Sequence, residues 1–237
     1  MDVARGQYVQ GVIGEMLPRG SSGSAAMAQA FHASDITLPS GSKDEIPSSH
    51  SPFCMLTLDL SEFPLLRTER LDLRPIAQDD AHALYAMRSD PRVMRHIGRP
   101  MASTLQDAVE LITRIEDNWK AGVGITWAMV PHGSTDLIGT IGFYRWKLEH
   151  HLSEVGYMLH PDHWGKGLMA EALARCVDSG FEHFGFHRIE AITEPANSAS
   201  RRLLERSGFV HEATLKENYY WNGVFQDSCI YRRLVSA

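Results

Sequence analysis

The chain has 237 residues, of which 43% are hydrophobic, and a formal net charge of −6 at pH 7. This length allows one or two domains with a substantial core, and the acidic balance offers no basic surface for nucleic acid or an anionic membrane. No apolar run reaches membrane-spanning length, and the first residues show no signal-peptide pattern. We therefore expect a cytoplasmic protein that binds neither nucleic acid nor membrane.

The cysteines and histidines give no sign of a metal site. Cys54, Cys176 and Cys229 are far apart and form no CxxC pair, so neither disulfides nor zinc are indicated. The histidines within 150–151, 160–163 and 183–187 suggest no helical i,i+4 ligand pair and are more often solvated loop residues than metal ligands. The expectation is a protein without a bound metal.

Residues 1–60 differ in composition from the rest of the chain. Segments 20–24, 39–42 and 47–52 are rich in Ser, Gly and Pro and have no hydrophobic periodicity. Such a composition buries too little apolar surface to offset the entropy of ordering. We predict a disordered tail over 1–60 and a folded domain over 61–237, and translation from Met27 or Met55 instead of Met1 remains open.

Hydrophobic periodicity predicts the elements of the folded part in chain order. Ser103 to Gln106 fits a capping box at a helix start, and Asn197 and Gly208 fit the cap and the left-handed end of a short helix. The strands are expected at 70–74, 125–130, 137–146, 154–159, 188–193, 209–215 and 225–233, and the helices at 79–88, 104–121, 168–184 and 199–207.

The stretch 154–173 is the most informative part of the sequence. A strand is stopped by Pro161, a tight loop follows over 164–167, and an amphipathic helix begins directly after it. The first turn of a helix presents unpaired N–H groups and partial positive charge, and glycines let a bulky anion approach the backbone. The stretch therefore predicts a cradle for a pyrophosphate group.

Two common phosphate-binding motifs do not fit this loop. A nucleoside-triphosphate P-loop needs glycine where His160 stands and Ser or Thr where Gly167 stands. A Rossmann fingerprint needs a third glycine, which neither position 169 nor 170 supplies.

The loop does resemble the acyl-CoA-binding motif of the GNAT superfamily of N-acetyltransferases, Gln/Arg-x-x-Gly-x-Gly/Ala. The matching residues are 164–169, with Gly165 and Gly167 in place, whereas Trp164 and Met169 depart from the consensus. Residues 195–209 match a second motif of the superfamily, Asn-x-x-Ser/Ala followed by hydrophobic residues and Gly-Phe. The branch that it resembles is that of the ribosomal-protein alanine N-acetyltransferases.

This resemblance covers about residues 65–234 and implies an α/β fold. The GNAT fold has a mixed central sheet, here of about seven strands flanked by about four helices, splayed between the fourth and fifth strands. Gly156 would permit a bulge in the central strand at the splay. Acetyl-CoA would be the acetyl donor, and the residues expected to hold it are Tyr157, Met158, Leu159, Trp164, Gly165, Lys166, Gly167, Leu168, Met169, Ala170 and Asn197.

The chemistry of acetyl transfer calls for a base, because an amine attacks a thioester only when it is neutral. Two carboxylates compete for this role: Glu212, which matches Gly-Phe-x-x-Glu of the same branch and is favoured, and Glu154 on the central strand. Ser200 matches a serine that this branch places near the sulfur, where it would return a proton. A solvent-facing position is the alternative for each of the three.

The sequence thus predicts an N-acetyltransferase that moves an acetyl group from acetyl-CoA to a primary amine by direct attack. By resemblance, the acceptor is a protein N-terminal amine, and a small amine is the alternative. A non-catalytic acyl-CoA-binding module and either a monomer or a homodimer also remain open. The acceptor mouth is expected between 90–102, which carries Arg92, Arg95 and Arg99, and 217–226.

Overall fold

The computed structural model describes residues 55–235. Most of the predicted tail lies outside this range, and so does the choice between Met1 and Met27 as the start. Residues 55–60, which the sequence assigned to the tail, lie along the domain, where Leu56, Leu58 and Leu60 pack against the main core. Ordered structure therefore begins before Leu65.

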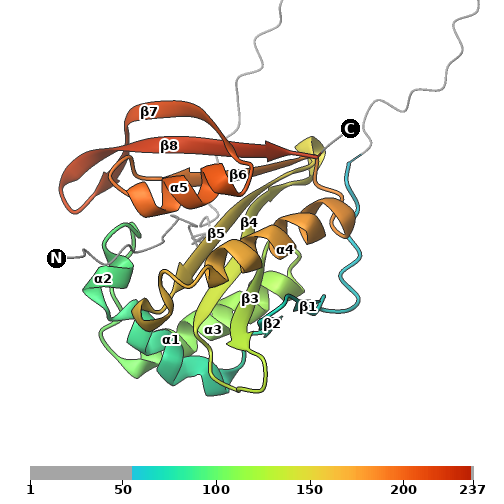
Figure 1. Cartoon of the computed structure of the whole chain (residues 1–237), viewed down its shortest axis with the longest axis vertical. Helices are drawn as coiled ribbons and strands as arrows, with labels where there is room; N and C mark the ends of the chain where they lie inside the picture. The colour runs from blue at the N-terminus through green and yellow to red at the C-terminus, as the bar shows by residue number, and fades with distance from the viewer. Residues whose placement is uncertain (1–54, 236–237) are drawn as a thin grey trace, which may run out of the picture. The chain divides into compact units, whose positions relative to one another are not determined.

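Within residues 55–235, eight strands form one mixed sheet in the order β1-β2-β3-β4-β5-β6-β8-β7 (Figure 1). All neighbouring strands are antiparallel except β5 and β6, which are parallel. The strands are β1 (Leu66–Arg67), β2 (Leu71–Pro75), β3 (Ile125–Pro131), β4 (Gly139–Lys147), β5 (Leu152–Leu159), β6 (Arg188–Thr193), β7 (Val210–Trp221) and β8 (Val224–Leu234).

Helices cover both faces of the sheet. They are α1 (Ala81–Arg88), α2 (Pro91–Met94), α3 (Leu105–Lys120), α4 (Leu168–Glu182) and α5 (Ser198–Arg206), with short 3₁₀ turns at Gln78–Asp80, Leu148–His150 and Pro161–His163. No helix within residues 55–235 is long and apolar enough to cross a membrane. The prediction of an α/β fold with a GNAT-like element order is confirmed.

The alternation of β5 divides the core into two layers. Val155, Tyr157 and Leu159 belong to the larger cluster, together with the apolar side of α4. Met158 points the other way and belongs to the cluster formed with α1 and α3. Because side chains alternate along a strand, Glu154 shares the face of Met158, as the sequence predicted.

Several local predictions need correction. The N-cap of α3 is Thr104, whose side chain pairs reciprocally with Asp107, and not Ser103. The predicted bulge at Gly156 is wrong, because β4 and β5 pair in continuous register from Gly139↔Leu159 to Tyr144↔Glu154. The register shift lies instead in β4, between Tyr144 and Lys147.

Short and exposed elements were missed for physical reasons. β1 has two residues and α2 has four, too few to show a hydrophobic period. β7 runs on to Trp221 although its side chains are mostly exposed, so it carries little apolar alternation. Asn222 and Gly223, with φ of 48° and 82°, form the turn to β8 that the sequence predicted.

Candidate functional site

The sheet is split between its two parallel strands. β5 and β6 pair at only three positions, from Leu152↔Arg188 to Glu154↔Glu190. Beyond Glu154, β5 continues along β4 and β6 continues along β8, so the two facing edges are not paired with each other. Backbone N–H and C=O groups at such an edge are available to a ligand. The predicted Tyr157, Met158 and Leu159 lie along this edge.

The glycine loop follows the end of β5 and leads into α4. Gly165 and Gly167 have φ of 74° and 77°, in the region that favours glycine, and Gly167 is the N-cap of α4. The Trp164 indole donates a hydrogen bond to the Leu159 carbonyl oxygen at 2.8 Å. The loop is therefore fixed to the strand end, and the first amides of α4 are free of side-chain caps.

Arg70 holds the glycine loop through side-chain contacts. Its guanidinium donates to the Lys166 carbonyl oxygen at 3.0 Å and pairs with Glu171 of the first helical turn at 2.6 Å. The ion pair keeps the Glu171 carboxylate directed at Arg70, although an acidic side chain in a first turn could otherwise compete for the same helix end.

A hollow of about 250 Å³ lies between the start of α4 and the side of α5. Gly165, Gly167 and Ala170 line one side, and Arg202 and Arg206 of α5 lie on the other. Backbone amides, a helix N-terminus and two guanidinium groups together favour a phosphate-bearing ligand. The two arginines were not among the residues predicted from the sequence, although their i and i+4 spacing places them on one helix face.

Asn197, Ser200 and Tyr157 meet on the α5 side of the split. The Asn197 side chain accepts the Ser200 N–H at 3.1 Å, so the predicted cap is present. The hydroxyls of Tyr157 and Ser200 are 3.2 Å apart and both residues are buried. Burial raises the pKa of Tyr157, so its phenol keeps its proton. From the sequence, only the backbone of Tyr157 was expected to contact acetyl-CoA.

Glu154 lies on the opposite face, at the last paired position of β5. Its side chain is 3% exposed and accepts a hydrogen bond from Arg145 at 2.5 Å. Oε1 of Glu154 is buried without a hydrogen-bond partner among the described residues. Desolvation raises the pKa of Glu154 to about 7, and the Arg145 charge only partly opposes it. A carboxyl group with this pKa gains and loses protons near neutral pH.

The irregularity of β4 directs Arg145 toward Glu154. Arg145 has φ of 51°, which is uncommon outside glycine, and follows Tyr144, the cross-strand neighbour of Glu154. Extra residues in a bulge re-aim a side chain relative to regular pairing. Burial raises the pKa of Tyr144 to about 12, and its hydroxyl contacts Thr126 Oγ1 at 3.2 Å.

Glu212, the other predicted base, has a different environment. It is exposed on β7, where its carboxylate is held by Arg188 and by Arg232. The hydrogen bonds from Arg188 and the two positive charges lower the pKa of Glu212. Arg188 pairs with Leu152, at the closed end of the split. A doubly ion-paired carboxylate with a lowered pKa is a poorer proton acceptor than a carboxylate with a pKa near 7.

The two segments that the sequence predicts for the acceptor mouth lie close together. A cavity of about 380 Å³ is lined by both predicted segments, including Arg95 and Arg99 from one and Trp221 and Gln226 from the other. Two hydrogen bonds hold the first segment to the far side of the split. His96 Nδ1 lies 2.7 Å from a Glu194 carboxylate oxygen, and the Tyr219 hydroxyl donates to the Gly98 carbonyl oxygen at 2.5 Å.

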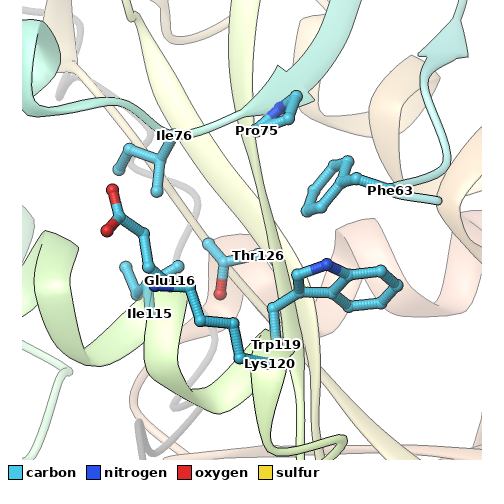
Figure 2. Close-up of a pocket in the computed structure, with 8 residues that line it drawn as sticks. All are labelled: Phe63, Pro75, Ile76, Ile115, Glu116, Trp119, Lys120 and Thr126. Atoms are coloured by element: carbon cyan, nitrogen blue, oxygen red, sulfur yellow. The ribbon is translucent and has the colours of Figure 1, made fainter. Parts of the chain in front are cut away.

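A third, smaller hollow of about 100 Å³ lies beside α3 and contains none of the predicted site residues. Figure 2 shows its apolar lining, with the Glu116 and Lys120 side chains among the rings and aliphatic groups. Among residues 55–235, no three His, Cys, Asp or Glu side chains gather in a manner suited to a metal ion.

The split sheet with its glycine loop defines an acetyltransferase of the GNAT family. The acetyltransferase (GNAT) domain model matches residues 70–210, which is more than half of the chain. The protein therefore belongs to the GNAT family, and it is an N-acetyltransferase.

Individual proteins and solved structures are similar to this chain over most of their length. It is 36% identical over 169 residues to the uncharacterized N-acetyltransferase YoaA of Bacillus subtilis, covering 71% of this chain and 96% of that protein. It is 24% identical to the spermidine N(1)-acetyltransferase of Vibrio cholerae, covering 67% of this chain and 89% of that protein. The solved structure of RimL, a ribosomal L7/L12 alpha-N-protein acetyltransferase in complex with coenzyme A, has a TM-score of 0.67 at 17% identity, with 73% and 98% coverage.

Proposed function

We propose that this protein transfers the acetyl group of acetyl-CoA to the N-terminal amine of a polypeptide by direct attack. The observation that carries this proposal is the position of Glu154, a buried carboxyl group with a pKa near 7 where β5 and β6 separate. General bases are most effective when their pKa lies close to the working pH.

The acetyl-CoA site would extend from the glycine loop into the split. Amides of residues 164–170 would bind the pyrophosphate, and Arg202 and Arg206 would add charge to the phosphate groups. Backbone groups of Tyr157, Met158 and Leu159 would pair with the amides of the pantetheine arm. The Leu159 carbonyl oxygen already accepts from Trp164, which leaves one lone pair for this purpose. Asn197 lies at the edge of the same gap.

The reaction uses both faces of the split. On one face, Glu154 removes a proton from the ammonium group, directly or through water, and the neutral nitrogen attacks the thioester carbon. The C–N bond forms, the C–S bond breaks, CoA leaves as a thiolate, and the nitrogen gives up its second proton to solvent, which replaces the hydroxyl proton taken up by the sulfur. On the other face, the Tyr157–Ser200 pair carries hydroxyl protons, and one of them would protonate the sulfur. Backbone N–H groups along β5 would stabilise the oxyanion.

The pKa of Glu154 favours an α-amine over a lysine or a polyamine. An α-amino group has a pKa of about 7.7–8.0 and a lysine about 10.4. A base with a pKa near 7 is well matched to the first and about three units below the second. Spermidine, the acceptor in the name of one relative, belongs to the second group.

Calorimetric titration with acetyl-CoA tests the first part of the proposal. The wild-type protein is expected to bind, and Arg202→Gln to bind about tenfold more weakly, because one charge-assisted contact is worth about 1.5 kcal/mol or more. Arg67→Gln is the control, since Arg67 is an exposed arginine on β1. Equal affinity of the two variants would mean that α5 does not hold the phosphates.

Thiol release tests the second part. Each folded variant is supplied with acetyl-CoA and an N-terminal peptide. Glu154→Gln is expected to lose most turnover with acetyl-CoA affinity unchanged, while Glu212→Gln keeps it. Loss of activity only in Glu212→Gln would restore the original ranking of the two carboxylates.

A further inference from the structure

The cavity at the acceptor mouth has two walls of different origin. One wall is residues 91–101, the loop and short helix after α1, and the other is the turn of the β7–β8 hairpin. We call this cavity the mouth groove. Its lining comprises Pro91, Met94, Arg95, Ile97, Arg99, Pro100, Met101, Trp221, Asn222 and Gln226.

We infer that the mouth groove binds acidic side chains within the first few residues of the acceptor polypeptide, so that the enzyme selects acidic N-termini. This inference rests on the proposed function and deepens it, because it names a class of acceptor for the same site.

The charge of the groove is the first support. Its two charged lining residues, Arg95 and Arg99, are both cationic. Carboxylates in the neighbouring segments already have partners: Asp90 pairs with Arg92, Asp227 pairs with Lys216, and a Glu194 carboxylate oxygen lies 2.7 Å from His96 Nδ1. An acidic ligand would therefore meet positive charge without a competing free carboxylate from these three residues.

A third arginine increases this positive potential. Arg88 is the last residue of α1, and its guanidinium donates to the Pro100 carbonyl oxygen on the groove loop at 3.1 Å. Burial and repulsion from Arg99 and Arg114 lower the pKa of Arg88 to about 10. Like charges held together in partly buried positions cost free energy, and a bound anion would relieve this cost.

A series of contacts connects the groove to the proposed base. Tyr219 hydrogen-bonds the groove loop at Gly98, and its phenol is within electrostatic range of both Arg99 and Arg145. Arg145 in turn contacts Glu154. An acidic side chain near Arg99 and an amine near Glu154 can therefore belong to one short segment.

The remaining lining suits a polypeptide better than a small anion. Oε1 of Gln226 is buried without a hydrogen-bond partner among the described residues, and a backbone N–H of a bound chain would supply the donor. Met94 and Trp221 add apolar walls, which are common at peptide-binding surfaces. Polyamines are disfavoured because their charges would face the same arginines.

The test compares the acetylation of matched peptides. Three peptides begin with Ser and differ only at positions two and three, which are Asp-Asp, Asn-Asn or Lys-Lys, and spermidine serves as a cationic small amine. The wild-type enzyme is expected to show a kcat/KM for the Asp-Asp peptide about tenfold above that for Asn-Asn, which corresponds to about 1.4 kcal/mol, because two acidic side chains can pair with two arginines, and lower values still for Lys-Lys and spermidine.

Variants locate the preference in the groove. The double variant Arg95→Gln, Arg99→Gln is expected to lower kcat/KM for the Asp-Asp peptide to the value for Asn-Asn, with the Asn-Asn value and the acetyl-CoA affinity retained. Arg67→Gln, on the exposed β1, is expected to keep the preference. The preference of the wild type should also shrink as salt is raised from 50 to about 500 mM, because surface charge pairs are screened.

Each outcome has a separate meaning. Acetylation of all three peptides at similar rates would overturn the inference while leaving the proposed function intact. A preference for Asp-Asp that survives in the double variant would also overturn it. Acetylation of spermidine with none of the peptides would refute the proposed acceptor and the inference together.

Discussion

Replacing Glu154 with Gln should make the protein less active and more stable. In the folded protein, burial raises the pKa of Glu154 from an ordinary value of 4.5 to about 7. Between these two values the folded state binds more protons than the unfolded state, so the free energy of unfolding falls as pH rises through this window. At about 1.4 kcal/mol per pH unit, this increase in the pKa of Glu154 lowers the free energy of unfolding above pH 7 by an amount on the order of 3 kcal/mol.

Glu154→Gln removes this penalty because the amide stays neutral. Urea unfolding of both proteins should give similar stabilities near pH 4.5 and a difference of up to about 3 kcal/mol in favour of the variant at pH 8. The ion pair with Arg145 is already included in this figure, because it lowers the pKa that burial raises, and the Arg145 side chain is 43% exposed and is rehydrated easily.

Activity should move in the opposite direction. A general base contributes about 10²–10⁴ in rate, so turnover of the variant should drop by a factor in that range. In the wild type, kcat/KM should rise through about pH 7 as Glu154 loses its proton. In the variant only the limb from the acceptor amine, at about 7.7–8.0, should remain. Full activity with an unchanged pH profile, or no gain in stability at pH 8, would refute the assignment of Glu154 as a desolvated base.

Three further changes test the surrounding structure. Ser200→Ala should lower kcat about tenfold or less and leave acetyl-CoA affinity unchanged, since Tyr157 keeps its own proton; single-turnover rates check this, and an unaltered rate would remove Ser200 from the reaction. Arg70→Gln should weaken acetyl-CoA binding several-fold with kcat preserved, because the Glu171 pair and the loop contact are lost; equal calorimetric affinities would contradict this. Gly142→Ala should cost more than about 2 kcal/mol in urea unfolding, because the added methyl would overlap a carbonyl oxygen of β3; a smaller loss would mean that the strands can move apart.

Much of the fold could be predicted from the spacing of apolar residues along the sequence. Val155, Tyr157 and Leu159 alternate because one face of β5 packs on a helix, and this alternation is visible without a structure. The loop at 164–167 was equally visible, because Gly165 and Gly167 take backbone angles that favour glycine.

The choice between the two carboxylates was not predictable in the same way. Glu154 and Glu212 are both glutamates on strands, and only the folded chain shows that one is desolvated while the other lies between Arg188 and Arg232. Such an environment depends on contacts that are distant in sequence. The orientation of Arg145 toward Glu154 was not predictable either, because a bulge in β4 leaves no clear signal in the residue composition.

The split between β5 and β6 also has a thermodynamic consequence. In the described part of the chain, only three residue pairs join β6, β8 and β7 to the other five strands across the sheet. A ligand with amide groups that lies in the gap would act as an additional strand, and its binding free energy would add to the cohesion of the sheet. At a ligand concentration one hundred times Kd, the folded state would gain about 2.7 kcal/mol. In a cell, the level of the bound molecule would therefore influence how long each copy of the enzyme stays folded.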